Sequence, residues 1–479
     1  MTMHKSSFIK FILRSLTPLI IIFICGCKAV GPDYVPPEKQ VSRNWNTQLE
    51  GGLNEQEMDP NTLAMWWTTI DDPLLTELIE RAKTNNLDLK NAYSRVYESR
   101  ARRGMTIASL YPSLDLSGSA TRSRSRENKK TSSLYSTGLD AGWEMDIFGG
   151  TRRSVEAVSA DLQSVQENLH DVLVSLMAEV ALNYIDIRTY QARLAAVEAS
   201  IEAQTETYQL TLWRYEAQLN DELAVLQARY NLESSRSQIP TIRTGLEQSM
   251  NSLAVLLGEE PGRLHEEVSQ PKPLPEAPQN IAVGIPADII RRRPDIRSAE
   301  RSLAAQTARI GVAKASLYPS FTLNGSFGLN AASMSDISSA SWSLSGGPRF
   351  VWPVFNAGSI RQNIEVQSAL AEQSLIQYES VVLSAMEEVE NALISYVSEQ
   401  QKRENLRQAV QAAQTASELA QQKFQVGLTD FSDVLDTQRS VLSYQDQLAQ
   451  SDGSIISSLI RLYKALGGGW TPLESNNQL

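Results

Sequence analysis

The chain has 479 residues, of which 42% are hydrophobic and 21% charged, and its formal net charge is −11 at pH 7. This acidic balance argues against a nucleic-acid partner, because phosphate binding needs clustered lysine and arginine. Only two cysteines and three histidines are present, which leaves little material for a disulfide framework or a zinc site. No phosphate-binding glycine loop, dinucleotide fingerprint or Gly-x-Ser-x-Gly elbow occurs. The composition therefore does not indicate an enzyme.

The N-terminus resembles the signal peptide of a bacterial lipoprotein. A positively charged start precedes about nine apolar residues at 16–24, and Gly26-Cys27 follows. A membrane-spanning helix needs roughly twenty residues, so a retained transmembrane anchor is the weaker alternative. We predict cleavage after Gly26 and covalent lipid on Cys27, where several acyl chains would anchor the chain firmly. Lys28 is typical of sorting to the outer membrane.

The rest of the chain contains an internal duplication. The segment from Ala101, ARRGMTIASLYPSLDLSGS, returns at Ala308 as ARIGVAKASLYPSFTLNGS. Likewise, RYEAQLNDELAVLQ from Arg214 aligns with KFQVGLTDFSDVLD from Lys423. A proline-rich stretch that begins at Pro261 separates the copies, and we expect a non-helical linker there. The predicted order is a signal peptide (1–26), a lipidated extended segment (27–72), a first repeat (73–260), a linker (261–293), a second repeat (294–468) and a tail (469–479).

Each repeat is predicted to contain two β-strands. Hydrophobic residues alternate with polar or small residues over about 112–126 and 134–148, and again over about 319–331 and 340–355. Such strands have one apolar and one polar face. A sheet packed on a soluble core has the same pattern, but the strand lengths and the tryptophans near the strand ends favour a transmembrane barrel.

Four strands from one chain cannot close a barrel, and open sheet edges are not tolerated in lipid. Two chains would give eight strands, whose interior side chains can fill completely, whereas three would give twelve and leave an aqueous bore. We therefore expect at least three chains. Asp140, Glu144 and Asp146 alternate with apolar residues of the second strand, so we expect these carboxylates to line the lumen.

Long helices make up most of the remaining sequence. No proline occurs at 150–218 or 358–425, which predicts helices of about seventy residues, each roughly 100 Å long. Antiparallel mates are expected at 221–257 and 430–466, so each repeat forms a helical hairpin. The apolar stripes are narrow, which favours a hollow helical wall. An antiparallel coiled coil with a filled centre is the alternative.

Four longer motifs carry a family resemblance. They are the predicted mature start CKAVGPDYVPP, the stretch IPADIIRRRPDIRSAERSLAAQTARIGVAKASLYPSF, the hairpin turn KFQVGLTDFSDVLD and the ending ALGGGW. Together they resemble the outer membrane factors, the TolC-type channel family, and within it the NodT and OprM branch of efflux lipoproteins. The resemblance covers essentially the whole mature chain.

This resemblance implies an α+β membrane protein. It implies a homotrimer with a twelve-stranded transmembrane β-barrel, four strands per chain, continued by a long periplasmic α-helical barrel. The expected activity is passive exit of drugs, toxic compounds or metal ions through the outer membrane, without a cofactor apart from the lipid on Cys27. The expected partners are a periplasmic adaptor protein and an inner-membrane pump of the RND type. A type I protein-secretion channel and a structural envelope lipoprotein remain alternatives, and the sequence does not identify the substrate.

The resemblance also implies functional residues in the second hairpin. Asp433 and Asp436 match the aspartates that ring the periplasmic mouth of these channels, although acidic residues also favour the first turn of any helix. The tip 426–428, Val426-Gly427-Leu428, matches the segment that meets the adaptor, although a glycine after a helix is also a common cap. Phe424 and Thr429 replace the tyrosine and arginine that help to close TolC, so other contacts are expected to close this mouth.

Overall fold

The computed structural model describes residues 29–37, 44–56, 59–124, 126, 131–278 and 280–471. The predicted signal peptide at 1–26 and the predicted lipidation site Cys27 lie outside the described residues. The chain divides into two compact units. Unit 1 comprises Met1–Glu38, Arg95–Gln166 and Ser298–Glu379, and unit 2 comprises Lys39–Ser94, Glu167–Arg297 and Ser380–Leu479.

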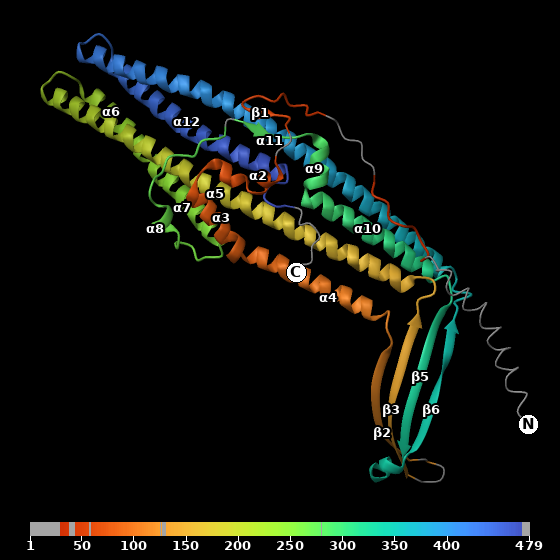
Figure 1. The fold of residues 1–479 in the computed structure, drawn as a ribbon. Helices are drawn as coiled ribbons and strands as arrows, with labels where there is room; N and C mark the ends of the chain where they lie inside the picture. The colour runs from red at the N-terminus through yellow and green to blue at the C-terminus, as the bar shows by residue number, and fades with distance from the viewer. Residues whose placement is uncertain are drawn as a thin grey trace, which may run out of the picture. The chain divides into compact units, whose positions relative to one another are not determined.

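A four-stranded antiparallel sheet is the main feature of unit 1 (Figure 1). Its strands are β2 (Ser113–Arg124), β3 (Thr131–Met145), β5 (Ser320–Ala331) and β6 (Ser341–Val351), in the order β2-β3-β5-β6. A 3₁₀ helix, η2 (Met334–Ser339), connects β5 to β6. The strands therefore lie where the alternation predicts them, and β2 and β6 form the two edges of the sheet.

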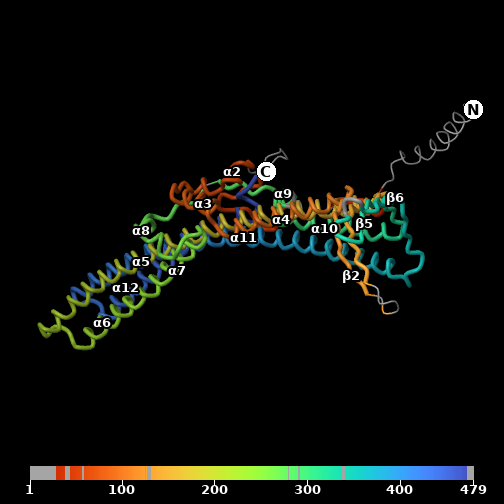
Figure 2. The backbone as a smooth tube through the Cα atoms, turned by 90° about the horizontal axis from the view of Figure 1, so that it is seen from below, coloured from red at the N-terminus to blue at the C-terminus, as the bar shows by residue number. Residues whose placement is uncertain are grey.

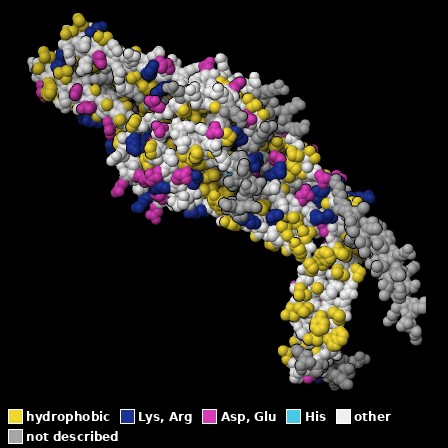
Figure 3. Space-filling model, in the orientation of Figure 1, with side chains coloured by type: hydrophobic (Ala, Val, Ile, Leu, Met, Phe, Trp, Pro, Cys, Tyr) yellow, Lys and Arg dark blue, Asp and Glu magenta, His cyan; other side chains and the backbone are white. Residues whose placement is uncertain are grey.

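The register of this sheet separates apolar from polar rows. One cross-strand row consists of Leu116, Leu139, Phe327 and Leu344. The adjacent row consists of Asp115, Asp140, Ser326 and Ser345. Because side chains alternate between the faces of a strand, these rows lie on opposite faces. Figure 3 shows hydrophobic side chains gathered over the sheet. On its strands, Leu116 and Leu344 are 76% and 72% exposed.

The two longest helices are α5 (Gly150–Glu216) and α11 (Ser359–Gln425), each of 67 residues. In unit 2 they continue into tight turns, and their mates follow (Figures 1 and 2). The mate of α11 is the continuous helix α12 (Phe431–Ala465). The mate of α5 differs from the prediction of one helix over 221–257, because it consists of α6 (Glu222–Arg236) and α7 (Gln238–Leu256). Pro240 explains the interruption, since it has no amide hydrogen and its ring conflicts with the carbonyl four residues earlier.

The linker is less irregular than the sequence predicts. Helix α9 (Pro286–Arg292) begins with a proline, which the first turn of a helix tolerates because that amide needs no partner. Strand β4 (Ile281–Ala282) pairs in parallel with β1 (Leu53–Asn54). The remaining helices, of which only α8 lies in the linker, are α2 (Pro60–Ala64), η1 (Trp66–Ile70), α3 (Pro73–Asn85), α4 (Leu87–Ala108), α8 (His265–Val268) and α10 (Pro294–Ala315).

The core of unit 2 is built around aromatic side chains. Trp66 is 1% exposed, and its ring stacks on Tyr463 with the centroids 5.5 Å apart. Arg188 is also buried, and it donates to Gln191 and to the carbonyl of Gln270. Within the described ranges, no helix combines the length and the hydrophobicity that crossing a bilayer would require.

Candidate functional site

The polar face of the sheet carries a pair of opposed carboxylates. Asp140 of β3 has Asp115 of β2 as its direct cross-strand neighbour. Two like charges in this position destabilise a sheet, so strand pairing alone does not explain them. The hydroxyl of Ser117 donates to Asp140 Oδ2 at 3.4 Å. Sequence analysis missed Asp115, although its place between Leu114 and Leu116 follows the same alternation.

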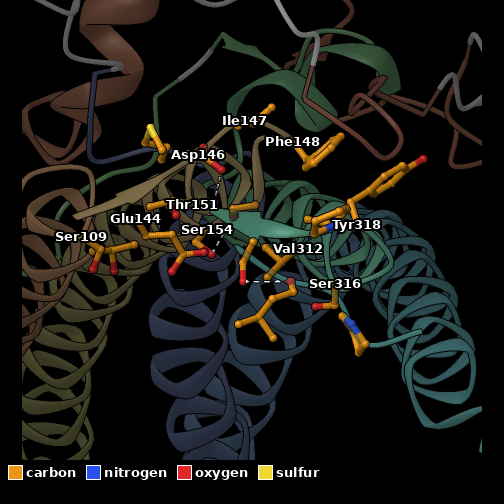
Figure 4. A pocket seen from close by; sticks show the side chains of 18 of the residues that line it. Ser109, Glu144, Asp146, Ile147, Phe148, Thr151, Ser154, Val312, Ser316 and Tyr318 are labelled. Atoms are coloured by element: carbon orange, nitrogen blue, oxygen red, sulfur yellow. Dashed lines mark hydrogen bonds between the residues drawn. The ribbon is translucent and has the colours of Figure 1, made fainter. Parts of the chain in front are cut away.

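Glu144 lies on this polar face, closer to the end of β3. It faces Thr322 of β5, which in turn faces Arg349 of β6, so the row contains a carboxylate and a guanidinium. A cavity of about 780 Å³ opens here, and Figure 4 shows Glu144, Ser154 and Tyr318 around it. The lining mixes hydroxyl, thioether and aromatic groups with the carboxylate, so both polar and apolar surfaces are available to a solute.

Asp146 has a role that sequence analysis did not identify. It follows the last residue of β3, and its carboxylate accepts hydrogen bonds from the amides of Thr151 at 3.1 Å and Arg152 at 2.8 Å. The Arg152 side chain also pairs with it at 3.2 Å. A carboxylate at this position satisfies free amides and complements the dipole of α5. Asp146 thus caps α5, and it also lines the cavity that Glu144 lines. Its place in a lumen stays a prediction.

The tip of the second hairpin exposes two apolar side chains on either side of a glycine. Val426 is 70% and Leu428 is 75% exposed, and Gly427 between them has φ +76°. The amide of Leu428 donates to the carbonyl of Lys423 at 2.9 Å, which closes the last turn of α11. The tip thus combines a helix cap with an apolar surface, and the two interpretations from the sequence are compatible.

Asp433 and Asp436 lie one turn apart near the start of α12, and each has a partner within the chain. The hydroxyl of Thr429 donates to the Asp433 carboxylate. Asp436 forms an ion pair with Arg439 at 3.0 Å, and the Asp436 side chain is 70% exposed. The charge of Asp433 is therefore not neutralised by its partner, whereas that of Asp436 is partly balanced.

Arg439 connects the second hairpin to the first. Its guanidinium donates to Asn231 Oδ1 at 2.7 Å and to the Tyr230 hydroxyl at 2.6 Å, both on α6. Farther along α12, Asp446 pairs with Arg193 of α5 at 2.7 Å. Sequence analysis did not identify these contacts, because they join residues more than 200 positions apart.

An apolar cluster supports the same region. Phe424 packs on Phe431 with the ring centroids 5.1 Å apart, and the guanidinium of Arg214 lies 4.9 Å from the Phe424 ring centroid. The buried members of the cluster are Ala224, Ala228, Ala420, Phe431, Val434 and Leu435. Phe424, which departs from the TolC pattern, therefore contributes packing and a cation–π contact between the hairpins.

One family of known proteins matches most of the chain. The sequence profile named outer membrane efflux protein matches residues 78–259 and 285–468. The chain belongs to this family. Its two matched segments correspond to the two halves that each contain a strand pair and a helical hairpin.

Individual members of the outer membrane efflux protein family match over nearly the whole chain. Nodulation protein T of Rhizobium leguminosarum bv. trifolii is 33% identical, and the match covers 96% of this chain and 98% of the relative. The toluene efflux pump outer membrane protein TtgI of Pseudomonas putida is 30% identical, with coverage of 96% and 98%. The solved structure of the outer-membrane channel OprN is 33% identical, with a TM-score of 0.84 and coverage of 92% of this chain and 100% of OprN. These relatives are named as channel, efflux or nodulation proteins, and none as an enzyme.

Outside the sheet, the carboxyl of Asp171 on α5 has a raised pKa. Burial raises the pKa of Asp171 above its ordinary range, and the nearby carboxylate of Asp295 raises it further, while Arg293 and Lys464 act in the opposite direction. Among the described residues, histidine, cysteine, aspartate and glutamate form no group suited to hold a metal ion.

Proposed function

We propose that three copies of this chain form an outer-membrane channel, which is the passive exit duct of a tripartite efflux system. A twelve-stranded β-barrel would cross the membrane, with four strands from each chain, and a long α-helical barrel would continue it into the periplasm. The sheet carries this proposal. Its faces differ in polarity, and within the described part of the chain its edge strands β2 and β6 pair on one side only. Closure between copies would satisfy both edges.

The proposed partners are a periplasmic adaptor protein and an inner-membrane pump of the RND type. Relatives named as components of toluene and solvent efflux pumps support this assembly. The proposed cargo is therefore a drug, another toxic compound or a metal ion that the pump selects. The lumen would carry the Asp115–Asp140 pair and Glu144, whose charges favour cationic traffic. The proposed anchor in the outer membrane is the lipid on Cys27.

The proposed gate is the periplasmic mouth at the hairpin tips. In a trimer Asp433 and Asp436 would each occur three times around a constriction, where their carboxylates would hold cations. The contacts of Arg439 with Asn231 and Tyr230, together with the Arg193–Asp446 pair, would keep the second hairpin against the first. They are the proposed substitutes for the closing residues of TolC.

Channel function can be tested in cells and in planar bilayers. Expression in a strain that lacks its own efflux channel, together with the cognate pump and adaptor, should restore resistance to the pump's substrates. The purified protein should conduct ions in steps of uniform size. Since the predicted mature chain has no cysteine apart from the lipidated one, cysteines placed on β2 and β6 should link copies into trimers. Failure of both conductance and trimer formation would contradict the proposal.

Adaptor docking at the tip can be tested with Gly427→Trp. No atom lies within 4 Å of a Cβ built at Gly427, so the tryptophan has room to cover the apolar tip, but the φ of +76° strains the backbone of any residue other than glycine. Trimer formation by the variant should therefore be checked alongside efflux. Efflux and adaptor cross-linking should be lost. Gly427→Gln is the matched control, because Gln218 holds the corresponding turn of the first hairpin with φ 60°. Wild-type efflux in the tryptophan variant would exclude this docking surface.

A further inference from the structure

A groove in unit 1 lies directly beside the first described residues. Its volume is about 440 Å³, and we call it the Tyr318 groove. It is lined by Ala29, Val30, Gly31, Lys314, Leu317, Tyr318 and Ile364. Leu317 and Tyr318 are 40% and 42% exposed. Most of the lining side chains are apolar, whereas backbone atoms, the Tyr318 hydroxyl and the Lys314 ammonium supply polar surface.

The walls of this groove are held in place by specific contacts. The ring of Tyr318 stacks on Phe148 with the centroids 4.6 Å apart (Figure 4). The indole of Trp352 donates to the carbonyl of Leu317 at 3.1 Å, and the amide of Val30 donates to the carbonyl of Phe148 at 3.1 Å. An open groove with fixed walls is a preformed binding site, since it does not require reorganisation on binding.

Arg153 holds the residues 29–31 that line one side of the groove. Its side chain is 4% exposed and pairs with Asp33 at 2.6 Å. Its guanidinium also donates to the carbonyl of Val30 at 3.1 Å and to those of Ala29 and Gly31 at 3.4 Å. One buried cation therefore holds three consecutive carbonyls.

Close backbone packing adds to this clamp. Gly31 has φ +102°, and a methyl group there would overlap the Cα of Gly311 on α10. Only glycine permits this approach. The position of Ala29 beside the groove is consequently defined by packing as well as by hydrogen bonds.

The residue proposed to carry lipid is Cys27, two positions before Ala29 in the sequence. Two residues span at most about 7 Å, so an acyl chain on Cys27 starts within reach of the groove. The chemistry of the lining fits such a chain. The side chains of Val30, Leu317 and Ile364 suit methylene groups, and the Lys314 ammonium can donate to an ester carbonyl of a diacylglyceryl group.

We propose that the Tyr318 groove is the seat of an acyl chain of the lipidated Cys27. The lipid would then be packed along its own protein for part of its length, and the Arg153 clamp would set where it leaves the protein. This inference rests on the proposed lipidation of Cys27. It adds a defined protein site to what would otherwise be a flexible membrane tether.

Photo-crosslinking in intact cells can test this inference. Cells that express the full-length chain are fed a palmitate analogue with a diazirine on its chain, irradiated, and the protein is analysed by mass spectrometry. The expected adducts join the Cys27 acyl chain to Leu317, Tyr318 or Ile364. Ile364→Asp should remove these adducts without reducing the labelling of Cys27. Val366→Asp is the matched control, because Val366 lies on the same helix, is 53% exposed and does not line the groove.

The outcomes distinguish occupancy of the groove by the acyl chain from lipidation of Cys27 itself. A labelled Cys27 whose adducts lie only on membrane lipid or on the strands would overturn the groove and leave the anchor intact. Adducts of phospholipid mass at the groove residues would show that a membrane lipid occupies it instead. Absence of label from Cys27 would overturn the anchor and the groove together. Channel function would still be tested separately, by conductance, which does not depend on this labelling.

Discussion

The two helical hairpins share a backbone plan and differ in chemistry. Both turns contain a residue in the left-handed region, Gln218 in the first and Gly427 in the second. At the start of the returning helix, the first hairpin has the buried Ala224 where the second has Asp433. Arg439 of the second hairpin corresponds to Tyr230 of the first, and these two side chains contact each other. Duplication therefore retained the geometry of the turn, while Asp433, Asp436 and Arg439 have no charged counterpart at the corresponding positions of the first hairpin.

The returning helices also approach α5 differently. A side chain at Gly453 of α12 would overlap the Oγ1 and Cβ of Thr189, whereas one at Gly245 of α7 would meet the outer end of the Tyr190 ring. Atoms close to the backbone cannot move aside as readily as the end of a ring. The contact of α12 with α5 therefore tolerates a larger side chain less well than the contact of α7 with α5.

The largest expected effect follows from this difference in packing. Gly453→Leu should lower the free energy of unfolding by about 3 kcal/mol, at the upper end for overpacking, and Gly245→Leu by about 1 kcal/mol. Thermal unfolding of both variants in detergent measures the difference. Equal losses would indicate that α7 and α12 are packed against α5 with the same tolerance.

The next effect concerns the contact between the hairpins. Arg439→Ala removes hydrogen bonds to Asn231 and Tyr230. Because the guanidinium is partly exposed, we expect this loss to destabilise the closed arrangement by only about 1–2 kcal/mol. Single-channel conductance should rise, and cells should become permeable to large antibiotics. Arg236→Ala is the control, because among the described residues Arg236 forms its ion pair with Glu233 on its own helix. Unchanged conductance would exclude Arg439 from the closing contacts.

The aspartates should have a smaller effect, on ion preference. At 6 Å two unit charges repel by about 0.7 kcal/mol in water, so a ring of carboxylates binds cations modestly. Asp433→Ala with Asp436→Ala should weaken cation preference and relieve block by a trivalent hexammine cation. Asp433→Ala alone should account for most of the change, because Arg439 partly balances Asp436. Gln227→Ala changes the corresponding uncharged position of the first hairpin.

The relevant measurements are the reversal potential in a salt gradient and the cation block. If wild type and the double variant agree in both, the aspartates serve only to start α12. The charge selectivity would then have to come from Asp115, Asp140 and Glu144 on the sheet.

The smallest effect concerns Asp171 on α5, away from both tips. Its pKa is raised in the folded protein, so the folded state binds its proton more tightly than the unfolded state does. Stability contributed by this proton is present at low pH and is lost as the pH rises from about 4 through the raised pKa. Asp171→Asn should therefore raise the unfolding temperature at pH 7 and have little effect near pH 4. A pH-independent difference would contradict this assignment.

The sequence by itself determined the elements that depend on local periodicity. Alternation located the four strands, and the absence of proline located α5 and α11 to within a few residues. Both signals are local, because a strand repeats every two residues and a helix is interrupted wherever an amide hydrogen is missing. The same reasoning overlooked Pro240, whose position inside a long helical pattern divides the mate of α5 into α6 and α7.

Only the tertiary structure decided which side chains meet. Asp115 faces Asp140 because of the strand register, and Asp146 caps α5 because β3 ends one residue earlier. The contacts of Arg439 with Tyr230 and the hold of Arg153 on residues 29–33 likewise join distant parts of the sequence. Such contacts depend on the packing of separate elements, and no local pattern specifies them because the partner residues carry no fixed spacing.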